Sequence, residues 1–128
     1  MAKPGAEPKP RSELGARGEE LAVKFLRAKG YAILTRNFRS SVGEIDIVAR
    51  EARTLVFVEV KTRETDGFGS AKWAVDQHKR RKVSMAALAY LNLKGWADRP
   101  ARFDVVAVDI AAGEPRIELY RNAFDLAY

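Results

Sequence analysis

Two neighbouring stretches in the middle of the chain combine β-branched and aromatic residues with regularly spaced charges. They are residues 43–50 (Gly-Glu-Ile-Asp-Ile-Val-Ala-Arg) and residues 54–62 (Thr-Leu-Val-Phe-Val-Glu-Val-Lys-Thr), and the polar residues 51–53 separate them. Apolar runs divided by a short polar break predict a pair of strands joined by a tight turn. Since residues two apart in a strand point to the same side, we expect Glu59 and Lys61 to share one face.

Helical periodicity marks two longer segments. Residues 12–29 carry one apolar stripe, with Ser12 as a capping residue and Gly30 as the stop. Residues 71–94 show a second stripe, which ends before Gly95. The stripes are formed by Leu14, Leu21, Ala22, Phe25 and Leu26 in the first helix and by Val75, Ala86, Ala89, Tyr90 and Leu93 in the second.

Three further strands complete the pattern. They are expected at residues 31–37, at residues 102–110 and, as a short final strand, at residues 117–120, with residues 38–42 and 63–70 as connections. The resulting order is α-β-β-β-α-β, followed by the extra strand. It predicts an α/β fold bordering on α+β, in which a mixed central sheet is flanked by one helix on each side.

Composition indicates one globular domain. Of the 128 residues, 47% are hydrophobic and 31% are charged, which is usual for a globular protein and enough for one core. Residues 1–11 contain three prolines and little to bury. We therefore expect a disordered tail, followed by a single domain over residues 12–128.

Charge and cysteine content narrow the function classes. Lys and Arg number 23 against 17 Asp and Glu, which gives a net charge of +6 and favours a polyanionic partner, nucleic acid first. The absence of Cys excludes disulfides and thiolate sites, and the single His78 leaves little room for a His-based triad or a zinc site. No apolar run approaches the ~20 residues of a membrane span, so we expect a cytoplasmic protein with no membrane partner.

The predicted strands place four charged side chains among apolar neighbours. Glu44 and Asp46 are expected on one face of the first strand of the pair, as Glu59 and Lys61 are on the second. Acids within an apolar sheet are unfavourable unless their desolvation is compensated. A divalent cation such as magnesium can compensate it. Cross-strand pairing of Lys61 with Asp46 or Glu59 on a half-exposed face can do so too, and the pattern alone leaves both open.

Charged residues on the two helices extend this set. Glu19 lies at the edge of the first apolar stripe and can lean over the sheet, whereas Glu20 lies almost opposite the stripe and should be solvated. In the second helix, Lys79 and Lys82 fall on the apolar stripe and need an anionic neighbour. A group of carboxylates or a bound phosphate backbone would supply one.

Four motifs, taken in order, resemble a known family. Gly18-Glu19, Gly43-Glu44-Ile45-Asp46, residues 57–62 and residues 102–106 (Arg-Phe-Asp-Val-Val) are similar to the YraN family over residues 14–110. This is an uncharacterised bacterial group with a predicted restriction-endonuclease-like fold. The order of elements resembles the PD-(D/E)XK nuclease core, and archaeal Holliday-junction resolvases in particular. Ile45 stands where that superfamily has proline, and the role of the extra carboxylate Glu44 stays open.

The resemblance implies a site and a cofactor. The groups expected to bind magnesium or manganese are the side chains of Asp46, Glu59 and Glu19 and the carbonyl of Val60. The catalytic set is Glu19, Asp46, Glu59 and Lys61, in which the lysine helps to activate water or to stabilise charge. Contacts to nucleic-acid phosphates are expected from Arg39, Lys79, Arg80 and Lys82.

The function expected from the resemblance is that of a metal-dependent endonuclease. It would hydrolyse phosphodiester bonds of DNA rather than RNA, with branched or junction DNA as the candidate substrate. A homodimer is expected, because junction-cutting enzymes make two incisions. Two alternatives stay open: a non-catalytic nucleic-acid-binding module that keeps the fold, and a structural protein whose acids and lysines form a buried ion network.

Overall fold

Five strands form one sheet in which the spatial order is the order along the chain, β1-β2-β3-β4-β5. The computed structural model describes residues 13–64, 77–110 and 114–124. The elements are α1 (Glu13–Ala28), β1 (Ala32–Ser40), β2 (Gly43–Glu51), β3 (Thr54–Arg63), α2 (Gln77–Lys94), β4 (Ala101–Asp109) and β5 (Arg116–Phe124). The predicted mixed sheet and its flanking helices are confirmed.

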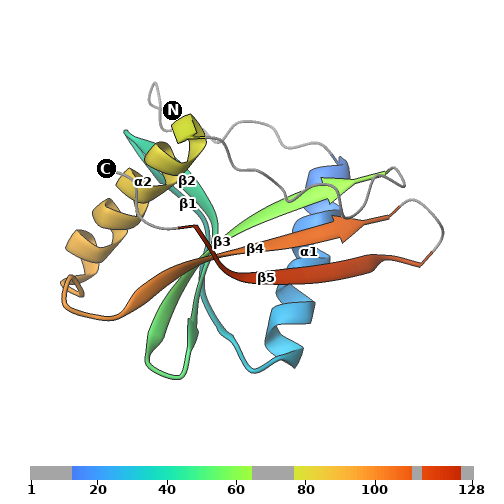
Figure 1. Ribbon diagram of the computed structural model, residues 1–128, viewed down its shortest axis with the longest axis horizontal. Helices are drawn as coiled ribbons and strands as arrows, with labels where there is room; N and C mark the ends of the chain where they lie inside the picture. Colours follow the sequence, from blue (N-terminus) through green and yellow to red (C-terminus); the bar gives the residue numbers. More distant parts are fainter. Residues whose placement is uncertain (1–12, 65–76, 111–113, 125–128) are drawn as a thin grey trace, which may run out of the picture.

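Only one pair of neighbouring strands is parallel. β3 and β4 run in the same direction, and the other three pairs are antiparallel. A parallel pair needs a long crossover connection, and α2 lies within that connection. As Figure 1 shows, α1 and α2 lie on opposite sides of the sheet, so each face of the sheet is covered by one helix.

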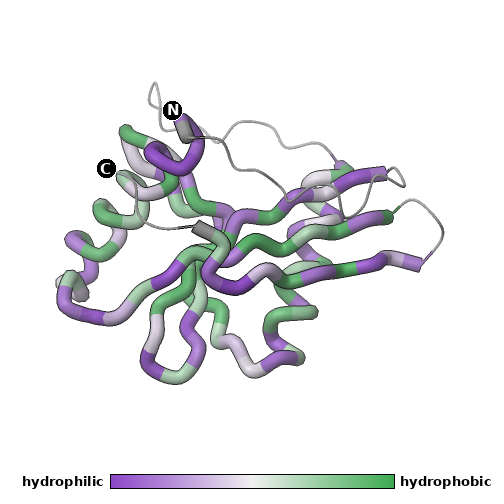
Figure 2. Tube along the Cα trace, in the orientation of Figure 1, coloured by the Kyte–Doolittle hydropathy of each residue, from purple (hydrophilic) through white to green (hydrophobic). Residues whose placement is uncertain are grey.

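The two faces of the sheet hold two separate apolar cores, visible as green segments along the strands in Figure 2. We call them the α1-side core and the α2-side core. The α1-side core joins Ala22, Val23 and Leu26 of the helix to Ile47, Ala49, Val56, Val58, Val106 and Val108. The α2-side core joins Val83, Ala86, Ala87 and Tyr90 to Ile45, Val48, Phe57, Phe103, Val105 and Ala107.

β1 is longer than the sequence predicts. The strand continues through Ser40, and only Ser41 and Val42 form the turn before β2. Phe38 packs against the α2-side core, which keeps the chain extended there. The Ser40 hydroxyl then closes the turn by donating to the Gly43 carbonyl at 3.1 Å and accepting from the Val42 N–H at 3.2 Å.

β5 also exceeds its prediction, because a buried ionic network holds its second half. Asp104, with no exposed surface, accepts hydrogen bonds from Tyr31 Oη at 3.0 Å, from Arg102 Nε at 2.9 Å and from the Asn122 N–H at 2.9 Å. Arg102 reaches further and binds Glu51 at 2.6 Å. This network ties β5 to β4, β2 and the start of β1.

The second helix buries part of the predicted stripe, Ala86 and Tyr90, but the rest of its buried face differs from the prediction. Tyr90 is buried and its hydroxyl lies 2.9 Å from Thr35 Oγ1. Leu93, which the periodicity places on the apolar stripe, is 71% exposed, and Lys82 is exposed as well. The helix turns so that Val83 and Tyr90 fill the core.

Some sequence predictions lie outside the described residues. They are the tail at residues 1–11, the Ser12 cap, residues 65–70 of the connection and the first turns of the second helix at residues 71–76. Within the described ranges, neither helix has the length and apolar character that a membrane crossing requires.

Candidate active site

Asp46 and Glu59 lie at the point where β2 and β3 stop pairing as a regular ladder. The antiparallel register runs from Glu51 opposite Thr54 to Ile47 opposite Val58, so Asp46 and Glu59 occupy the next position. There the Asp46 carboxylate accepts the backbone N–H of Val60 at 2.8 Å. This hydrogen bond ties the Asp46 side chain to the backbone of β3 beside Glu59.

The inside-outside alternation of β2 breaks at Asp46. Ile45 belongs to the α2-side core, yet Ile47, two residues later, belongs to the α1-side core. On the neighbouring strand, Asn37 falls opposite Asp46 in the register and has a φ of 56°, a conformation that asparagine tolerates better than most residues. The prediction that Glu44 and Asp46 share a face assumed unbroken alternation along this strand, and the placement of Ile45 and Ile47 shows that the alternation does not hold here.

Two lysines lie beside the buried Glu59 carboxylate. Lys79 Nζ, from the first turns of α2, lies 3.1 Å from Glu59 Oε2, and Lys61 Nζ lies 3.9 Å from the same oxygen. Glu59 is 7% exposed, and attraction to these ammonium groups offsets the cost of its burial. The anionic neighbour expected for Lys79 is therefore Glu59.

The electrostatics of the site concentrate on Asp46. Burial and then repulsion by Glu59 raise the pKa of Asp46 from 3.8 to about 7, although the Val60 N–H and Lys79 act in the opposite direction. Partial burial acts to lower the pKa of Lys79, but attraction to Glu59, Asp46 and Glu44 outweighs it, so that this pKa is raised. Burial, reinforced by Glu59, thus outweighs the favourable contacts of the Asp46 carboxylate, and Asp46 takes up a proton near neutral pH.

Glu19 lies next to the sheet but binds other partners. It is 3% exposed, accepts from Asn37 Nδ2 at 3.1 Å and lies 3.5 Å from Arg36 Nε. Glu20 is solvated, as its helical position predicts, and pairs with Arg36 at 3.1 Å. At Gly18 a Cβ atom would overlap the side chain of Thr62, so this glycine lets α1 approach β3 and brings Glu19 to the sheet.

The remaining predicted residues are spread around this centre. Arg39 pairs with Glu44 at 3.4 Å, and Glu44 adds to the negative potential at Asp46. Arg80 is half-buried, and Lys82 is exposed where its backbone carbonyl approaches Gly43. Within residues 13–64, 77–110 and 114–124, no group of three or more His, Asp or Glu side chains is arranged to hold a metal ion. The structure therefore joins Asp46 to Glu59 and leaves Glu19 with its own partners.

Two residues of this region escaped sequence reasoning. Arg36 and Asn37 hold the Glu19 carboxylate, and Asn37 also lies opposite the break in β2. Their side chains follow no apolar period, and the one local signal was an asparagine within a predicted strand, where this residue is uncommon.

The donor set fits a hard divalent cation. Asp46 Oδ2 is occupied by the Val60 N–H and Glu59 Oε2 by the two lysines. The other oxygens, Asp46 Oδ1 and Glu59 Oε1, have no hydrogen-bond or ion-pair partner in the described part of the chain. Magnesium and manganese prefer carboxylate and carbonyl oxygens, and a cation here would relieve the repulsion that raises the Asp46 pKa.

Comparison with known proteins gives one consistent result. The model of the uncharacterised protein family UPF0102 matches residues 18–108, a range that includes every residue of the site. A UPF0102 protein of Geobacter sulfurreducens is 55% identical over 116 residues, which cover 90% of this chain and 91% of that protein. UPF0102 proteins of Geobacter metallireducens and Desulfosudis oleivorans are 50% and 48% identical, each over 90% of this chain and 94% and 92% of their own length.

Proposed function

This chain belongs to the UPF0102 family, the family of the YraN proteins, and from that premise we propose that it is a divalent-metal-dependent endonuclease acting on DNA. One observation carries the proposal. Asp46 and Glu59 are held side by side at the end of the β2–β3 ladder, where burial and mutual repulsion raise the pKa of Asp46 to about 7. Such strongly perturbed carboxylates are characteristic of functional sites.

Magnesium or manganese would be held by Asp46 Oδ1, Glu59 Oε1 and the Val60 carbonyl. When bound, such an ion would supply a water of lowered pKa and would polarise the phosphate. Asp46 must lose its proton for this role, and the nearby ammonium of Lys79 favours that loss. In the hydrolysis, the water oxygen would form a new bond to phosphorus and give up a proton to solvent, while the bond from phosphorus to one sugar oxygen breaks and that oxygen takes up a proton from solvent.

Lys61 and Lys79 have different parts in this proposal. Lys61 Nζ is 3.9 Å from Glu59 and its side chain is 34% exposed, so it can turn toward a phosphate and stabilise the charge that develops there. Lys79, at 3.1 Å, pairs with the Glu59 carboxylate and would hold it in position. Glu19 accepts a hydrogen bond from Asn37 and would hold this residue, which has a φ of 56°, in place opposite Asp46.

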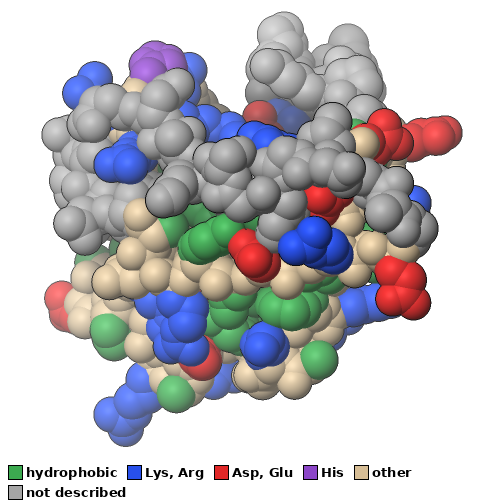
Figure 3. All heavy atoms as spheres, turned by 45° about the vertical axis from the view of Figure 1, so that its right-hand side comes forward, with side chains coloured by type: hydrophobic (Ala, Val, Ile, Leu, Met, Phe, Trp, Pro, Cys, Tyr) green, Lys and Arg blue, Asp and Glu red, His purple; other side chains and the backbone are tan. Residues whose placement is uncertain are grey.

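The choice of DNA, and of branched DNA in particular, follows from the resemblance to junction resolvases. The net charge of +6 supports a polyanionic substrate. On the face seen in Figure 3, Lys and Arg side chains are interspersed with Asp and Glu rather than gathered in one basic patch. Individual basic residues, Arg39, Arg80 and Lys82 among them, would therefore contact phosphates one at a time.

The test is cleavage of labelled four-way junctions, flaps and linear duplexes in magnesium, in manganese and in EDTA. Asp46→Asn and Glu59→Gln should each lower the rate by a factor of about 100 or more, while Glu20→Gln, which alters a solvated acid one residue from Glu19, should cut like the wild type. The proposal fails if the wild type cuts none of these DNAs in either metal, or if Asp46→Asn cuts equally well.

A second candidate is a non-catalytic nucleic-acid-binding module. The observation that favours it is that Lys61 and Lys79 both lie against Glu59 and balance its charge without a metal. This module would bind DNA in a salt-dependent way, and the binding would survive Asp46→Asn. Calorimetric titration of the wild type with magnesium separates the two, since only the nuclease has a magnesium site that the substitution removes.

A further inference from the structure

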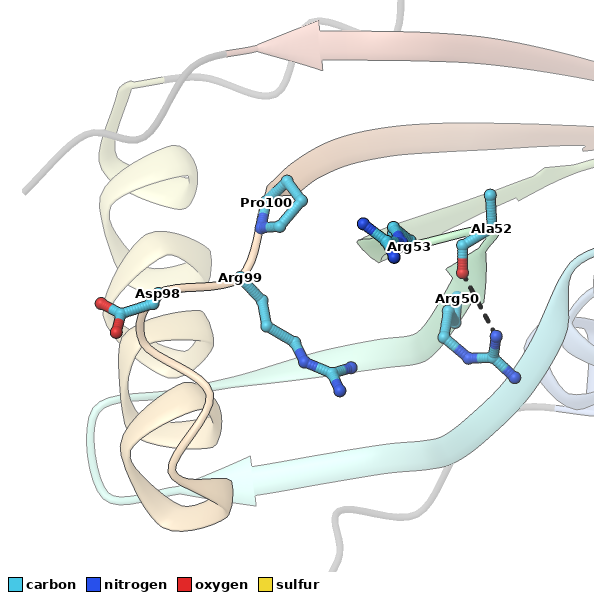
Figure 4. Close-up of a pocket in the computed structure, with 6 residues that line it drawn as sticks. All are labelled: Arg50, Ala52, Arg53, Asp98, Arg99 and Pro100. Carbon is cyan, nitrogen blue, oxygen red and sulfur yellow. Dashed lines mark hydrogen bonds between the residues drawn. The ribbon is translucent and has the colours of Figure 1, made fainter.

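A second charged site lies at the other end of β2 and β3 from Asp46. The turn between these strands and the segment that leads from α2 into β4 border an open, solvent-exposed cavity of about 510 Å³. Its lining, drawn in Figure 4, consists of Arg50, Ala52, Arg53, Asp98, Arg99 and Pro100.

The cavity carries positive charge that its surroundings do not neutralise. Three of its six lining residues are arginines, and the one carboxylate, Asp98, points away from their guanidinium groups in Figure 4. Among the described residues, no carboxylate pairs with Arg50, Arg53 or Arg99. By contrast, Arg121 on β5 has a carboxylate partner, because its guanidinium lies 3.0 Å from Glu51.

Two of the three arginines, Arg50 and Arg99, are held in place by contacts with the protein. Arg50 Nη1 donates to the Ala52 carbonyl at 3.2 Å, and the Arg99 guanidinium lies over the Trp96 ring, 4.7 Å from its centroid. The Pro100 carbonyl accepts the Leu55 N–H at 2.9 Å, which joins the two walls of the cavity. Guanidinium groups fixed in this way lose less conformational freedom when they bind an anion.

We propose that this cavity binds phosphate groups of a nucleic-acid backbone, as an anchoring site apart from the site of cleavage. The inference rests on the proposed function in taking nucleic acid as the ligand. Guanidinium groups match phosphate oxygens with paired, charge-assisted hydrogen bonds. The volume of about 510 Å³ exceeds what a single phosphate needs, so the cavity suits a stretch of backbone.

The spacing of the two sites suits one nucleic acid. Arg50 follows Asp46 by four residues on the same strand, a distance of roughly 13 Å at about 3.3 Å per residue. Because a duplex advances ~3.4 Å per base pair along its axis, a duplex that lay along β2 would span this distance with about four base pairs. The arginine cavity would then set the position of the cut relative to a fixed point on the backbone.

The experiment measures binding without cleavage, by anisotropy of a fluorescein-labelled DNA duplex in EDTA over a series of salt concentrations. Removal of one arginine–phosphate pair reduces the slope of log K against log salt by about 0.9. We expect Arg53→Gln to reduce the slope by about one and Arg53→Gln/Arg99→Gln by about two. Arg27→Gln is the matched control, because Arg27 is an exposed arginine on α1, which covers the opposite face of the sheet.

Three outcomes overturn the inference. The first is that the variants have the same salt slope as the control, and the second is that the wild type does not bind DNA. The third is that Arg53→Gln/Arg99→Gln loses the calorimetric binding of inorganic phosphate but keeps the salt slope of the wild type for DNA, which would make the cavity a site for free phosphate only. Arg53→Gln changes a turn residue with no described side-chain contact, and thermal melts verify that it folds. Failure here is distinct from failure of the proposed function. An unchanged slope together with magnesium-dependent cleavage removes only the anchoring site, and a reduced slope without cleavage removes only the nuclease.

Discussion

Replacing Asp46 by Asn should stabilise the protein at pH 8 and leave its stability almost unchanged at pH 4. The asparagine amide would keep an oxygen for the Val60 N–H, which now donates to the carboxylate at 2.8 Å, and would remove the negative charge beside Glu59. The substitution thus removes the buried negative charge and keeps the hydrogen bond to Val60, so the change in unfolding free energy reports the electrostatic cost of the Asp46 charge.

The magnitude follows from the pKa of Asp46, which is raised by burial and by Glu59 from 3.8 to about 7. Because the folded state binds this proton more tightly than the unfolded state, the proton's contribution to stability is complete below pH 3.8 and is lost as the pH rises through 7. At ~1.4 kcal/mol per pH unit, the upper limit is about 4 kcal/mol. Solvent reaches part of this carboxyl, so we expect about 2 kcal/mol, or roughly 8 °C in Tm.

The assay is urea unfolding of the wild type, Asp46→Asn and Glu20→Gln at a series of pH values from 4 to 8. The gain of Asp46→Asn over the wild type should grow between pH 4 and pH 7 and then level off, whereas Glu20→Gln should stay within about 0.5 kcal/mol of the wild type throughout. Magnesium at pH 8 should stabilise the wild type and not Asp46→Asn. A gain that is the same at every pH, or a loss at pH 8, refutes the electrostatic reasoning.

Three further predictions test other contacts. Gly18→Ala should cost about 1–3 kcal/mol in urea unfolding, because its Cβ overlaps Thr62. Thr62→Ala in the same chain should restore part of the loss, since it removes the two closest atoms and leaves the Thr62 Cβ; no restoration contradicts the contact. Arg102→Met should cost about 3–5 kcal/mol, because it leaves a fully buried carboxylate without its cation, and a loss below about 1 kcal/mol in the same assay rules this out. Lys79→Met should move the Asp46 titration midpoint above 7, because the lysine lowers that pKa; an unchanged midpoint in NMR speaks against their coupling.

The elements of the fold could be predicted because each has a strong local pattern. The stretch from Thr54 to Thr62 is apolar, β-branched and bounded by polar residues, and it forms β3. The strand ends were less accessible, because tertiary contacts decide them. β1 continues to Ser40 since Phe38 finds a place in the α2-side core, and β5 extends because Asp104 binds the Asn122 N–H.

The orientation of α2 could not be read from its sequence. Its described part begins with basic residues and carries scattered small apolar ones, so several faces compete for burial. The choice depends on which side chains match the sheet, and the Tyr90 hydroxyl next to Thr35 is one such match. The sequence therefore predicts correctly that Lys79 has a carboxylate neighbour. It predicts wrongly that Leu93 is buried against the sheet.

The candidate site was accessible in part. Alternation along β3 predicts that Glu59 and Lys61 share a face, and their charged groups lie 3.9 Å apart. The tether from Asp46 to Val60 depends on the register between two strands and on the bend at Asn37. Neither the register nor the positive φ of Asn37 produces a periodic pattern of apolar residues, so neither can be recognised in the sequence.

The hydrogen bond between Asp46 and the backbone of β3 prevents the two carboxylates from moving apart, so the folded chain retains their repulsion as a permanent weakness at neutral pH. A random library selected only for heat resistance should accordingly enrich neutral residues at position 46. If those survivors also fail to cut DNA, position 46 would be a place where stability is given up for the proposed activity.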